Sequence, residues 1–232
     1  MREWACLTGA VMWALSLSPA LAGPACLTDS LSNYAALGSG GCDLGVFTVK
    51  DFGFSVLGMA EGVTPLDASL ITVTPGLSAG GPTLRFESGG FSVTGTEWVT
   101  YLISYNVDPP PVIIRGFDEE MEAESPVFPG WAQVNTSLCV GGIYSPGCTS
   151  GSTTSLSVSH QGTVWSLTAH ASFSPLVNML GVQHTIQLDG GGSGSADFQA
   201  LENRIETIPE PAAWLLGGCG LLMLLLLRRR AA

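Results

Sequence analysis

Four kinds of residue in this 232-residue chain have side chains suited to chemistry: a serine among glycines, three histidines, a run of carboxylates and three tryptophans outside the terminal segments. The pentapeptide Gly76-Leu77-Ser78-Ala79-Gly80 has the G-x-S-x-G form of a hydrolase nucleophile elbow. Such an elbow must open a helix, and the Gly80-Gly81-Pro82 sequence is incompatible with one. Ser78 is therefore predicted to lie in a loop turn and not to act as a nucleophile.

The histidines and carboxylates form no recognisable ligand set. His160, His170 and His184 occur singly in strand-like sequence, without H-E-x-x-H spacing, and are interpreted as ordinary strand residues. The acidic stretch from 118 to 124 offers oxygen ligands to Ca²⁺ but lacks EF-hand spacing and a positioning glycine. A solvated loop is favoured over a calcium site. The sequence predicts no metal, no cofactor and no enzymatic activity.

The tryptophans leave one binding hypothesis open. Trp98, Trp131 and Trp165 are the three in the central part of the chain. Because tryptophan is highly buried on average, the favoured interpretation places all three between sheets. The alternative concerns Trp98, which alternation assigns to the more polar face of its strand. An exposed indole at this position could stack on a sugar ring.

The C-terminal segment, residues 209–232, has three distinct parts. Pro209-Glu210-Pro211 is followed by an uncharged apolar run, Ala212–Leu227, and then by Arg228, Arg229 and Arg230. As a helix at roughly 1.5 Å per residue, the run reaches about 24 Å and only just spans a bilayer core of about 30 Å. The arginines would remain on the cytoplasmic side, which places the residues before Pro209 outside.

This order of parts resembles the bacterial PEP-CTERM sorting signal. The resemblance implies that a membrane exosortase recognises Pro209, Glu210 and Pro211 and cleaves the chain there, with residues 212–227 as a transient membrane anchor. An ordinary C-terminal membrane anchor is the competing interpretation.

The N-terminus also indicates export. Residues 4–17 are mostly apolar, and Ala20 and Ala22 supply the small-x-small pattern of a signal-peptidase site. Residues 1–22 are therefore predicted to be a signal peptide, with signal peptidase and the export machinery as partners. Between Gly23 and Pro211, four basic residues stand against 18 acidic ones, a formal charge of −14. This charge argues against nucleic acid as a partner.

Cysteine usage fits an exported domain. Four cysteines lie outside the two terminal segments, and an even number in an exported chain favours disulfides. Sequence spacing favours the local pairs Cys26 with Cys42 and Cys139 with Cys148 among the three possible pairings. Each loop of about 10 to 17 residues would contribute on the order of 3 kcal/mol.

The central part reads as one β domain, residues 23–189. Asp29 is expected to cap a short helix that ends at Gly38. Strand-like runs separated by glycine and proline follow: Val46–Val56, Ser69–Val73, Thr83–Glu87, Phe91–Thr94, Glu97–Val107, Val112–Phe117, Trp131–Val140, Ser155–His160, Val164–Phe173 and His184–Leu188. Ser88-Gly89-Gly90 predicts a hairpin.

The clearest strand alternates Val99, Tyr101, Ile103, Tyr105 and Val107 on a core face with polar residues such as Asn106 on a wet face. Many short strands with little helix indicate an antiparallel β-sandwich or jelly roll. Residues 190–208 are interpreted as a Gly/Ser-rich linker or a last strand.

Several further segments resemble a group of exported PEP-CTERM proteins of unassigned activity: Cys26, residues 37–42, residues 71–75, residues 101–105 and the late Gly-Gly-x-Gly. The resemblance implies a shared β fold and a place at the cell surface or in the extracellular matrix, in association with exopolysaccharide. It carries over no catalytic residue. A carbohydrate-binding module of the cell envelope is the alternative, and a secreted hydrolase the less favoured one.

Overall fold

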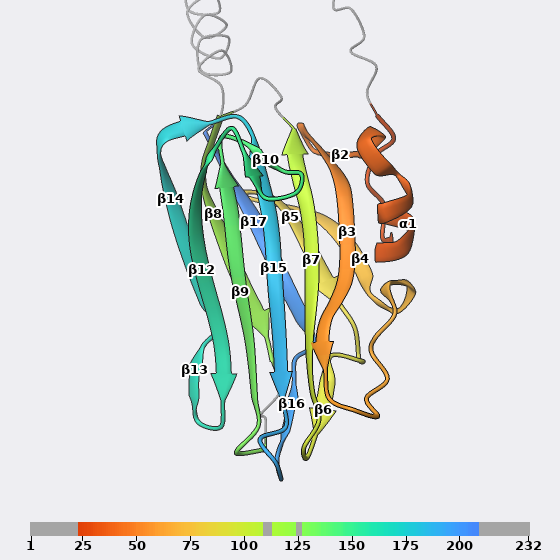
Figure 1. Ribbon diagram of the computed structural model, residues 1–232. Coiled ribbons are helices and arrows are strands. Elements are labelled where there is room, and N and C mark those ends of the chain that lie inside the picture. Colours follow the sequence, from red (N-terminus) through yellow and green to blue (C-terminus); the bar gives the residue numbers. More distant parts are fainter. Residues whose placement is uncertain (1–22, 109–112, 124–126, 209–232) are drawn as a thin grey trace, which may run out of the picture.

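Two antiparallel β-sheets face each other in the computed structural model of this protein, which describes residues 23–108, 113–123 and 127–208 (Figure 1). The all-β expectation is confirmed, and the architecture is a β-sandwich. The predicted signal peptide (1–22) and sorting signal (209–232) lie outside the described residues. Among those described, no helix combines the length and apolar character needed to cross a bilayer.

The front sheet of Figure 1 has seven strands, and all pairings between them are antiparallel. In spatial order they are β13 (Val164–Ser166), β12 (Ser152–Gln161), β9 (Trp131–Val140), β15 (Leu180–Asp189), β7 (Trp98–Asp108), β3 (Phe47–Met59) and β2 (Cys42–Leu44).

The back sheet has six strands, again antiparallel. Their order is β1 (Asp29–Ser30), β4 (Thr72–Ser78), β5 (Gly81–Glu87), β17 (Ala200–Ile208), β8 (Ile113–Glu122) and β14 (Thr168–Val177). Two short ribbons complete the strands: β10 (Ile143–Tyr144) with β11 (Cys148–Thr149), and β6 (Ser92–Thr94) with β16 (Ser195–Asp197).

The core lies between the sheets, where strand alternation directs the apolar residues. The predicted core face of β7 is confirmed, because the five residues assigned to that face, from Val99 to Val107 in alternate positions, are at most 2% exposed. Phe86 on β5 packs against Tyr105 on β7, with 5.9 Å between ring centroids. Burying large apolar side chains contributes roughly 1.5–3 kcal/mol each.

The N-terminal helix α1 (Leu31–Ala36) lies along the upper part of the right-hand side of the sandwich in Figure 1 and buries Leu31 and Tyr34. Its cap is Ser30 and not the predicted Asp29: the Ser30 side chain accepts the Asn33 N–H at 3.3 Å. Asp29 instead accepts the Asn33 side-chain amide at 2.7 Å. Two single 3-10 turns, η1 (Gly38–Gly40) and η2 (Ala68–Leu70), lie nearby.

Two local predictions were wrong because strand pairing is non-local. β5 and β6, expected to form a hairpin, pair with other strands. The run Val164–Phe173 is not one strand: after β13 the chain leaves the front sheet and continues as β14 in the back sheet. Of the two alternatives for residues 190–208, the last strand holds for residues 200–208, which form β17 in the middle of the back sheet.

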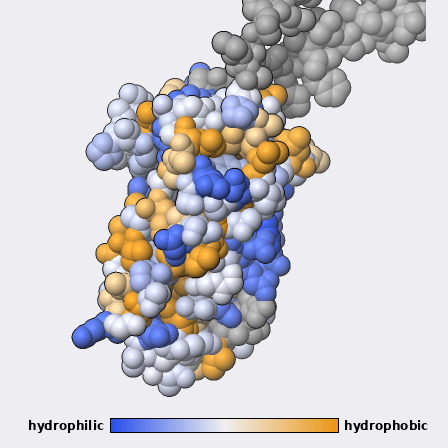
Figure 2. All heavy atoms as spheres, turned by 90° about the vertical axis from the view of Figure 1, so that its right-hand side faces the viewer, coloured by the Kyte–Doolittle hydropathy of each residue, from blue (hydrophilic) through white to orange (hydrophobic). Residues whose placement is uncertain are grey.

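The right-hand side in Figure 1 exposes the edge of both sheets, and Figure 2 shows this side with apolar patches among polar side chains. β3 contributes Leu57, which is 57% exposed, and the neighbouring turn η2 contributes Leu70, which is 63% exposed. The first and last described residues, 23 and 208, both lie at the upper end of the sandwich (Figure 1).

Candidate functional site

The outer face of the front sheet is polar, and three of its strands carry almost no charged residue. In β12, β9 and β15 the outward positions lie directly opposite one another. Asp189 is the only Asp, Glu, Lys or Arg in these three strands. Outward amide and hydroxyl groups form rows across the strands: Ser159, Gln133, Gln187 and Thr100; Ser157, Asn135 and Thr185; Ser155, Ser137, Gln183 and Ser104. The face therefore presents many hydrogen-bonding groups on a rigid scaffold.

Two tryptophans flank Asp189 at the lower end of this face. Asp189 on β15 lies directly opposite Trp98 on β7 and Trp131 on β9, so the three form one row across the strands, here called the tryptophan row. The adjacent residue on each strand is buried in the core, which fixes the outward direction of all three side chains. The row brings together residues that are far apart in the sequence.

The expectation that all three tryptophans lie between the sheets was wrong. Trp98 is 42% exposed and Trp165 is 64% exposed, while Trp131 is partly buried. Trp98 points outward because Val99 next to it takes the inward position. Trp165 is exposed for another reason: it sits on the short edge strand β13, all of whose residues are exposed.

The indole of Trp98 lies over a position that has no side chain. A Cβ added to Gly58 on the adjacent strand β3 would lie 3.1 Å and 3.2 Å from two carbons of the Trp98 ring. The glycine therefore permits the ring to approach the β3 backbone closely. The indole is held as a partly exposed apolar surface that lies over β3.

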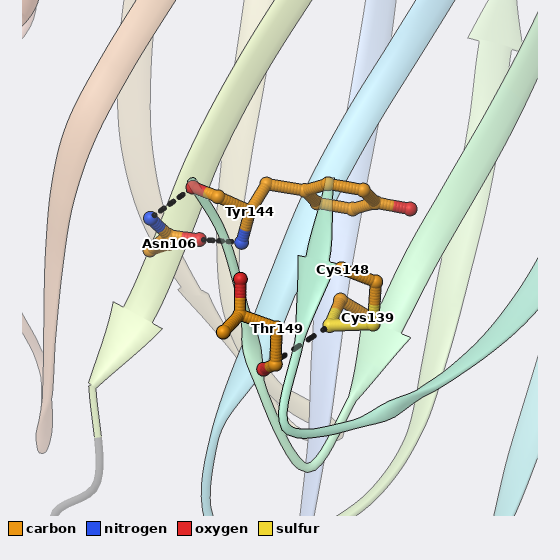
Figure 3. Close-up of a disulfide and its surroundings, with 5 residues drawn as sticks. All are labelled: Asn106, Cys139, Tyr144, Cys148 and Thr149. Atoms are coloured by element: carbon orange, nitrogen blue, oxygen red, sulfur yellow. Dashed lines mark hydrogen bonds between the residues drawn. A yellow bond between two sulfur atoms is a disulfide. The ribbon is translucent and has the colours of Figure 1, made fainter. Parts of the chain in front are cut away.

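A hairpin stapled by a disulfide covers the upper end of the same face (Figure 3). Asn106 on β7 accepts the Tyr144 N–H at 2.9 Å and donates to the Tyr144 carbonyl at 3.2 Å. Asn106 is therefore only 2% exposed, although alternation assigned it to a wet face. A Cβ on Gly181 would lie 2.7 Å from the Tyr144 nitrogen, so only glycine allows this approach.

Both predicted disulfides, Cys26–Cys42 and Cys139–Cys148, are confirmed. The first holds the segment before α1 onto β2. The second ties the β10–β11 hairpin to β9 at the upper end of the polar face (Figure 3). The spacing of the cysteines was sufficient to predict the pairing, but not the surface on which the hairpin lies.

The outer face of the back sheet is strongly charged. The acidic stretch expected as a loop instead continues strand β8, where Asp118, Glu120 and Glu122 face outward. Arg85 forms an ion pair with Glu122, and Arg204 donates to Asp118 at 2.8 Å from Nε. Burial alone raises the pKa of Asp118, but hydrogen bonds from Arg204 and His170 outweigh it and lower this pKa below its usual value.

A serine, a histidine and a carboxylate are adjacent on this charged face. His170 Nδ1 lies 2.6 Å from Asp118 Oδ1, and its Nε2 lies 2.7 Å from Ser172 Oγ. This is the side-chain combination that the hydrolase alternative requires. However, Ser172 stands on an exposed strand face, and strand N–H groups point within the plane of the sheet. The three side chains alone do not define a catalytic site, which also needs an oxyanion hole, usually the largest catalytic contribution in such sites.

The same histidine lies near a second carboxylate. Asp118, His170 and Glu206 bring their potential metal-ligating atoms within 4.8 Å of one another. Arg204 already pairs with Asp118, and Arg115 lies 3.4 Å from Glu206. These arginines balance the two carboxylates, so the cluster has no charge that calls for a metal ion.

Ser78 was predicted to lie in a turn, and the structure confirms this position. Ser78 ends β4, and the chain turns directly into β5, with which β4 pairs. Its hydroxyl donates to the Gly81 carbonyl at 2.7 Å. No helix follows it, so the G-x-S-x-G sequence forms a hairpin turn and not a nucleophile elbow.

A polar cluster lies inside the sandwich. Asn203 Oδ1 accepts the Tyr105 hydroxyl at 2.9 Å and lies 2.8 Å from His184 Nε2, which must therefore carry the proton. His184 Nδ1 then accepts the Thr136 hydroxyl at 2.6 Å. Burial lowers the pKa of His184 to about 4, and a hydrogen bond with Asn203 opposes this only in part.

Glu119 completes this interior cluster. Burial raises the pKa of Glu119 to about 7, against a smaller opposing effect of Thr136. Its Oε2 lies 3.9 Å from His184 Nδ1. Since both pKa shifts favour the neutral forms, we treat this contact as one between neutral groups and not as an ion pair.

Sequence reasoning identified Trp98 but missed Trp131 and Asp189 as its neighbours. The signal available in the sequence was the alternation of polar residues in 131–140 and 180–189, which marks two strands with one wet face each. The sequence does not indicate which strands are adjacent in the sheet, so the tryptophan row could not be predicted from it.

No protein-family model matches the chain, and no curated protein matches it. Among solved structures, TmCBM61 in complex with β-1,4-galactotriose is 11% identical at a TM-score of 0.34, covering 67% of this chain and 88% of that one. A family 11 carbohydrate-binding module from Clostridium thermocellum, in complex with a β-1,3-1,4-mixed-linked tetrasaccharide, is 13% identical at a TM-score of 0.26, covering 68% and 88%.

The enzymatically active domain of tailspike protein 4 from bacteriophage CBA120 is 11% identical at a TM-score of 0.26 and covers 72% of this chain and 20% of that one. At TM-scores this low, the similarity indicates neither a ligand nor an activity for this protein.

Proposed function

We propose that this protein is an exported, non-enzymatic glycan-binding protein of the cell surface or extracellular matrix, and that the tryptophan row is its binding site. The observation that carries the proposal is the pairing of two indoles with a carboxylate in one outward row. Pyranose rings present apolar C–H groups on their faces and hydroxyls at their edges. Indoles can pack against the former, while Asp189 and the amide rows can hydrogen-bond to the latter.

The charge distribution supports the same assignment. On the front face, Asp189 is the only charged residue in β12, β9 and β15, whereas the back face carries many carboxylates. A surface of this kind repels nucleic acid and anionic lipid. Uncharged polar chains remain as the ligands that the front face fits best.

We expect Trp98→Ala and Trp131→Ala each to weaken binding to a matrix polysaccharide by about tenfold or more, because each removes a stacking surface worth on the order of 1 kcal/mol beyond its area. The measurement is isothermal titration or affinity electrophoresis against the polysaccharides of the host matrix. Since both side chains point outward, the thermal unfolding midpoint should change by no more than a few degrees.

Trp165→Ala is the matched control, because Trp165 is even more exposed but pairs with the inward-facing His160, which directs it to the other side of the sheet from the row. It should leave binding unchanged. Equal affinities for wild type, Trp98→Ala and Trp131→Ala would remove the proposed site.

The export and sorting proposal rests on the terminal sequences. Exosortase would act at Pro209, Glu210 and Pro211, with residues 212–227 holding the chain in the membrane beforehand. Strand β17 ends at Ile208, directly before this triplet in the sequence. Residue 208 lies at the upper end of the sandwich and the tryptophan row at the lower end (Figure 1), so an anchored chain would present the row away from the membrane.

The sorting proposal predicts a mass difference between two strains. In the native host, the protein should have lost the residues from about Pro209 onward and should fractionate with the surface or matrix. In a strain lacking the exosortase, the tail should be retained and the protein should remain in the membrane fraction. The test is to measure the intact mass of the protein from both strains. An uncut tail in both strains would mean that the segment is an ordinary membrane anchor.

A further inference from the structure

We infer that the upper end of the sandwich is a membrane-contact surface, which lies on the lipid headgroups while the chain is anchored by its C-terminal segment. This inference rests on the proposed membrane anchor and adds a second, weaker contact with the same bilayer. The surface is defined by five exposed apolar side chains, here called the apolar end: Val46, Leu77, Ile113, Leu176 and Ile208.

The five side chains come from neighbouring parts of both sheets. Ile208 on β17 lies directly opposite Ile113 on β8. Leu176 belongs to β14, the next strand in the back sheet. Leu77 near the end of β4 reaches the front sheet, because a Cβ added to Gly45 would lie 3.1 Å from Leu77 Cδ2. Gly45 lies in the turn between β2 and β3, directly before the fifth residue of the group (Figure 1).

The charge of the two ends of the sandwich differs. Four segments that turn at the upper end contain no Asp, Glu, Lys or Arg: residues 44–49, 76–84, 138–154 and 171–183. The lower end, in contrast, has acidic residues in or beside its turns: Glu61, Glu97, Asp189 and Asp197. Anionic headgroups therefore repel the lower end, and the turns of the upper end can approach them without this cost.

The nearest charges below the apolar end include two ion pairs. Lys50 pairs with Asp108, and Arg115 pairs with Glu206. Each pair is formally neutral, so neither adds a net charge beside the apolar side chains. An exposed apolar group of this kind is typical of a surface that contacts another apolar phase.

The predicted anchor begins at the same end. Ile208 is followed by Pro209-Glu210-Pro211, so at most about 14 Å of chain separates it from Ala212 at the start of the apolar run. As a helix, the run is about 6 Å shorter than the hydrocarbon core of a bilayer. With the terminal arginines at the far interface, Ile208 would lie within about 8 Å of the near one, which is inside the headgroup layer.

Apolar side chains at this depth gain free energy by leaving water. The strength of such interfacial contacts scales with the apolar area that is buried, and a few side chains alone bind weakly. The anchor already holds the domain at the bilayer, so a weak contact is enough to orient it. The result is an upright domain whose tryptophan row, at the lower end, is directed away from the membrane (Figure 1).

The test maps lipid contacts on the full chain after removal of its signal peptide. The chain is reconstituted in vesicles of phosphatidylethanolamine and phosphatidylglycerol that contain a little phosphatidylcholine with a photoreactive diazirine in one acyl chain. Mass spectrometry then locates the lipid adducts. Adducts on residues 212–227 report the anchor itself. We expect further adducts on residues 44–47, 76–80 and 174–177, at a yield about fivefold or more above that on residues 60–64 and 162–165 at the lower end.

A double variant separates contact from mere proximity. Val46→Ser with Leu77→Ser should lower the adduct yield on residues 174–177 by about fivefold, because two apolar side chains no longer favour the docked position. Those residues are themselves unchanged, so the decrease is expected only if the end docks as one surface. All the replaced side chains are exposed, and the unfolding midpoint should stay within a few degrees of wild type.

The matched control is Leu57→Ser with Val164→Ser, at positions away from the apolar end. Leu57 is 57% exposed against 56% for Val46. Val164 is 74% exposed against 76% for Leu77. The control removes equally exposed apolar side chains and should leave the adduct yield on residues 174–177 unchanged.

The outcomes distinguish the contact from the anchor. Adducts on residues 212–227 without adducts at the apolar end, or a yield that the double variant does not lower, overturn the contact and leave the anchor standing. Protection of the upper turns from amide exchange in vesicles, without lipid adducts, would assign the surface to a second copy or another protein and also overturns the lipid contact. Absence of adducts on residues 212–227 overturns the anchor and the contact together.

Discussion

Replacing Glu119 by glutamine should make the free energy of unfolding fall by about 3 kcal/mol, relative to wild type, as the pH is lowered from 6.5 to 4. The variant leaves His184 alone in the core, with a pKa of about 4 against an ordinary value of 6.5. As the pH falls through 6.5, the unfolded state takes up a proton that the folded state does not take up until about pH 4. Each pH unit between these values costs about 1.4 kcal/mol.

The wild type should be nearly free of this dependence because Glu119 has the opposite shift. Its pKa is about 7 when folded, against an ordinary value of 4.5. Its contribution to stability is complete below pH 4.5 and is lost as the pH rises through 7. Between about pH 4.5 and 6.5, therefore, acidification strengthens the Glu119 contribution and weakens that of His184 by similar amounts.

The matched variant is His184→Gln, which leaves Glu119 alone and should lose stability in the other direction, as the pH rises from 4.5 to 7. Urea unfolding of the three proteins at one-unit pH intervals measures both slopes. The constant offset that each substitution adds does not matter, because the prediction concerns the slope. Parallel stability curves for all three proteins would show that the pair is not neutral in the folded state.

Removing the Cys139–Cys148 disulfide by serine substitution at both positions should lower stability by about 2.5 kcal/mol, because the cross-link no longer restricts the unfolded chain. For a domain of this size, such a loss lowers the unfolding midpoint by about 5–10 °C. The β10–β11 hairpin should also become a protease-sensitive segment, since only non-covalent contacts then hold it to the sheet, among them the pair of hydrogen bonds with Asn106 (Figure 3).

The Cys26–Cys42 disulfide provides the matched comparison. Its sequence separation is 16 against 9, so its removal should cost slightly more, about 3 kcal/mol. It lies at α1 and not at the polar face, so protease cutting in residues 141–151 should not increase. Thermal unfolding followed by mass mapping of limited proteolysis distinguishes the two variants. Equal cutting of the hairpin in both would contradict the stapling role of Cys139–Cys148.

The sequence was sufficient wherever local pattern decides structure. Alternation predicted the strand Trp131–Val140 with its observed bounds and the core face of β7. Short spacing predicted both disulfides, and the Gly-Gly-Pro sequence excluded the nucleophile elbow. These features depend on residues within a few positions of one another, where side-chain direction follows from a period of two.

Tertiary structure alone decided the identity of neighbouring strands, and with it the candidate site. Alternation marks Trp98, Trp131 and Asp189 as outward only if their strands are known, and nothing local places β7, β15 and β9 side by side. The same non-local pairing placed β17 in the middle of the back sheet and brought Glu119 next to His184. Asn106 is buried for a related reason, because the β10–β11 hairpin covers it. A strand's sequence specifies which face is apolar, whereas its partners are chosen by the packing of the whole sandwich.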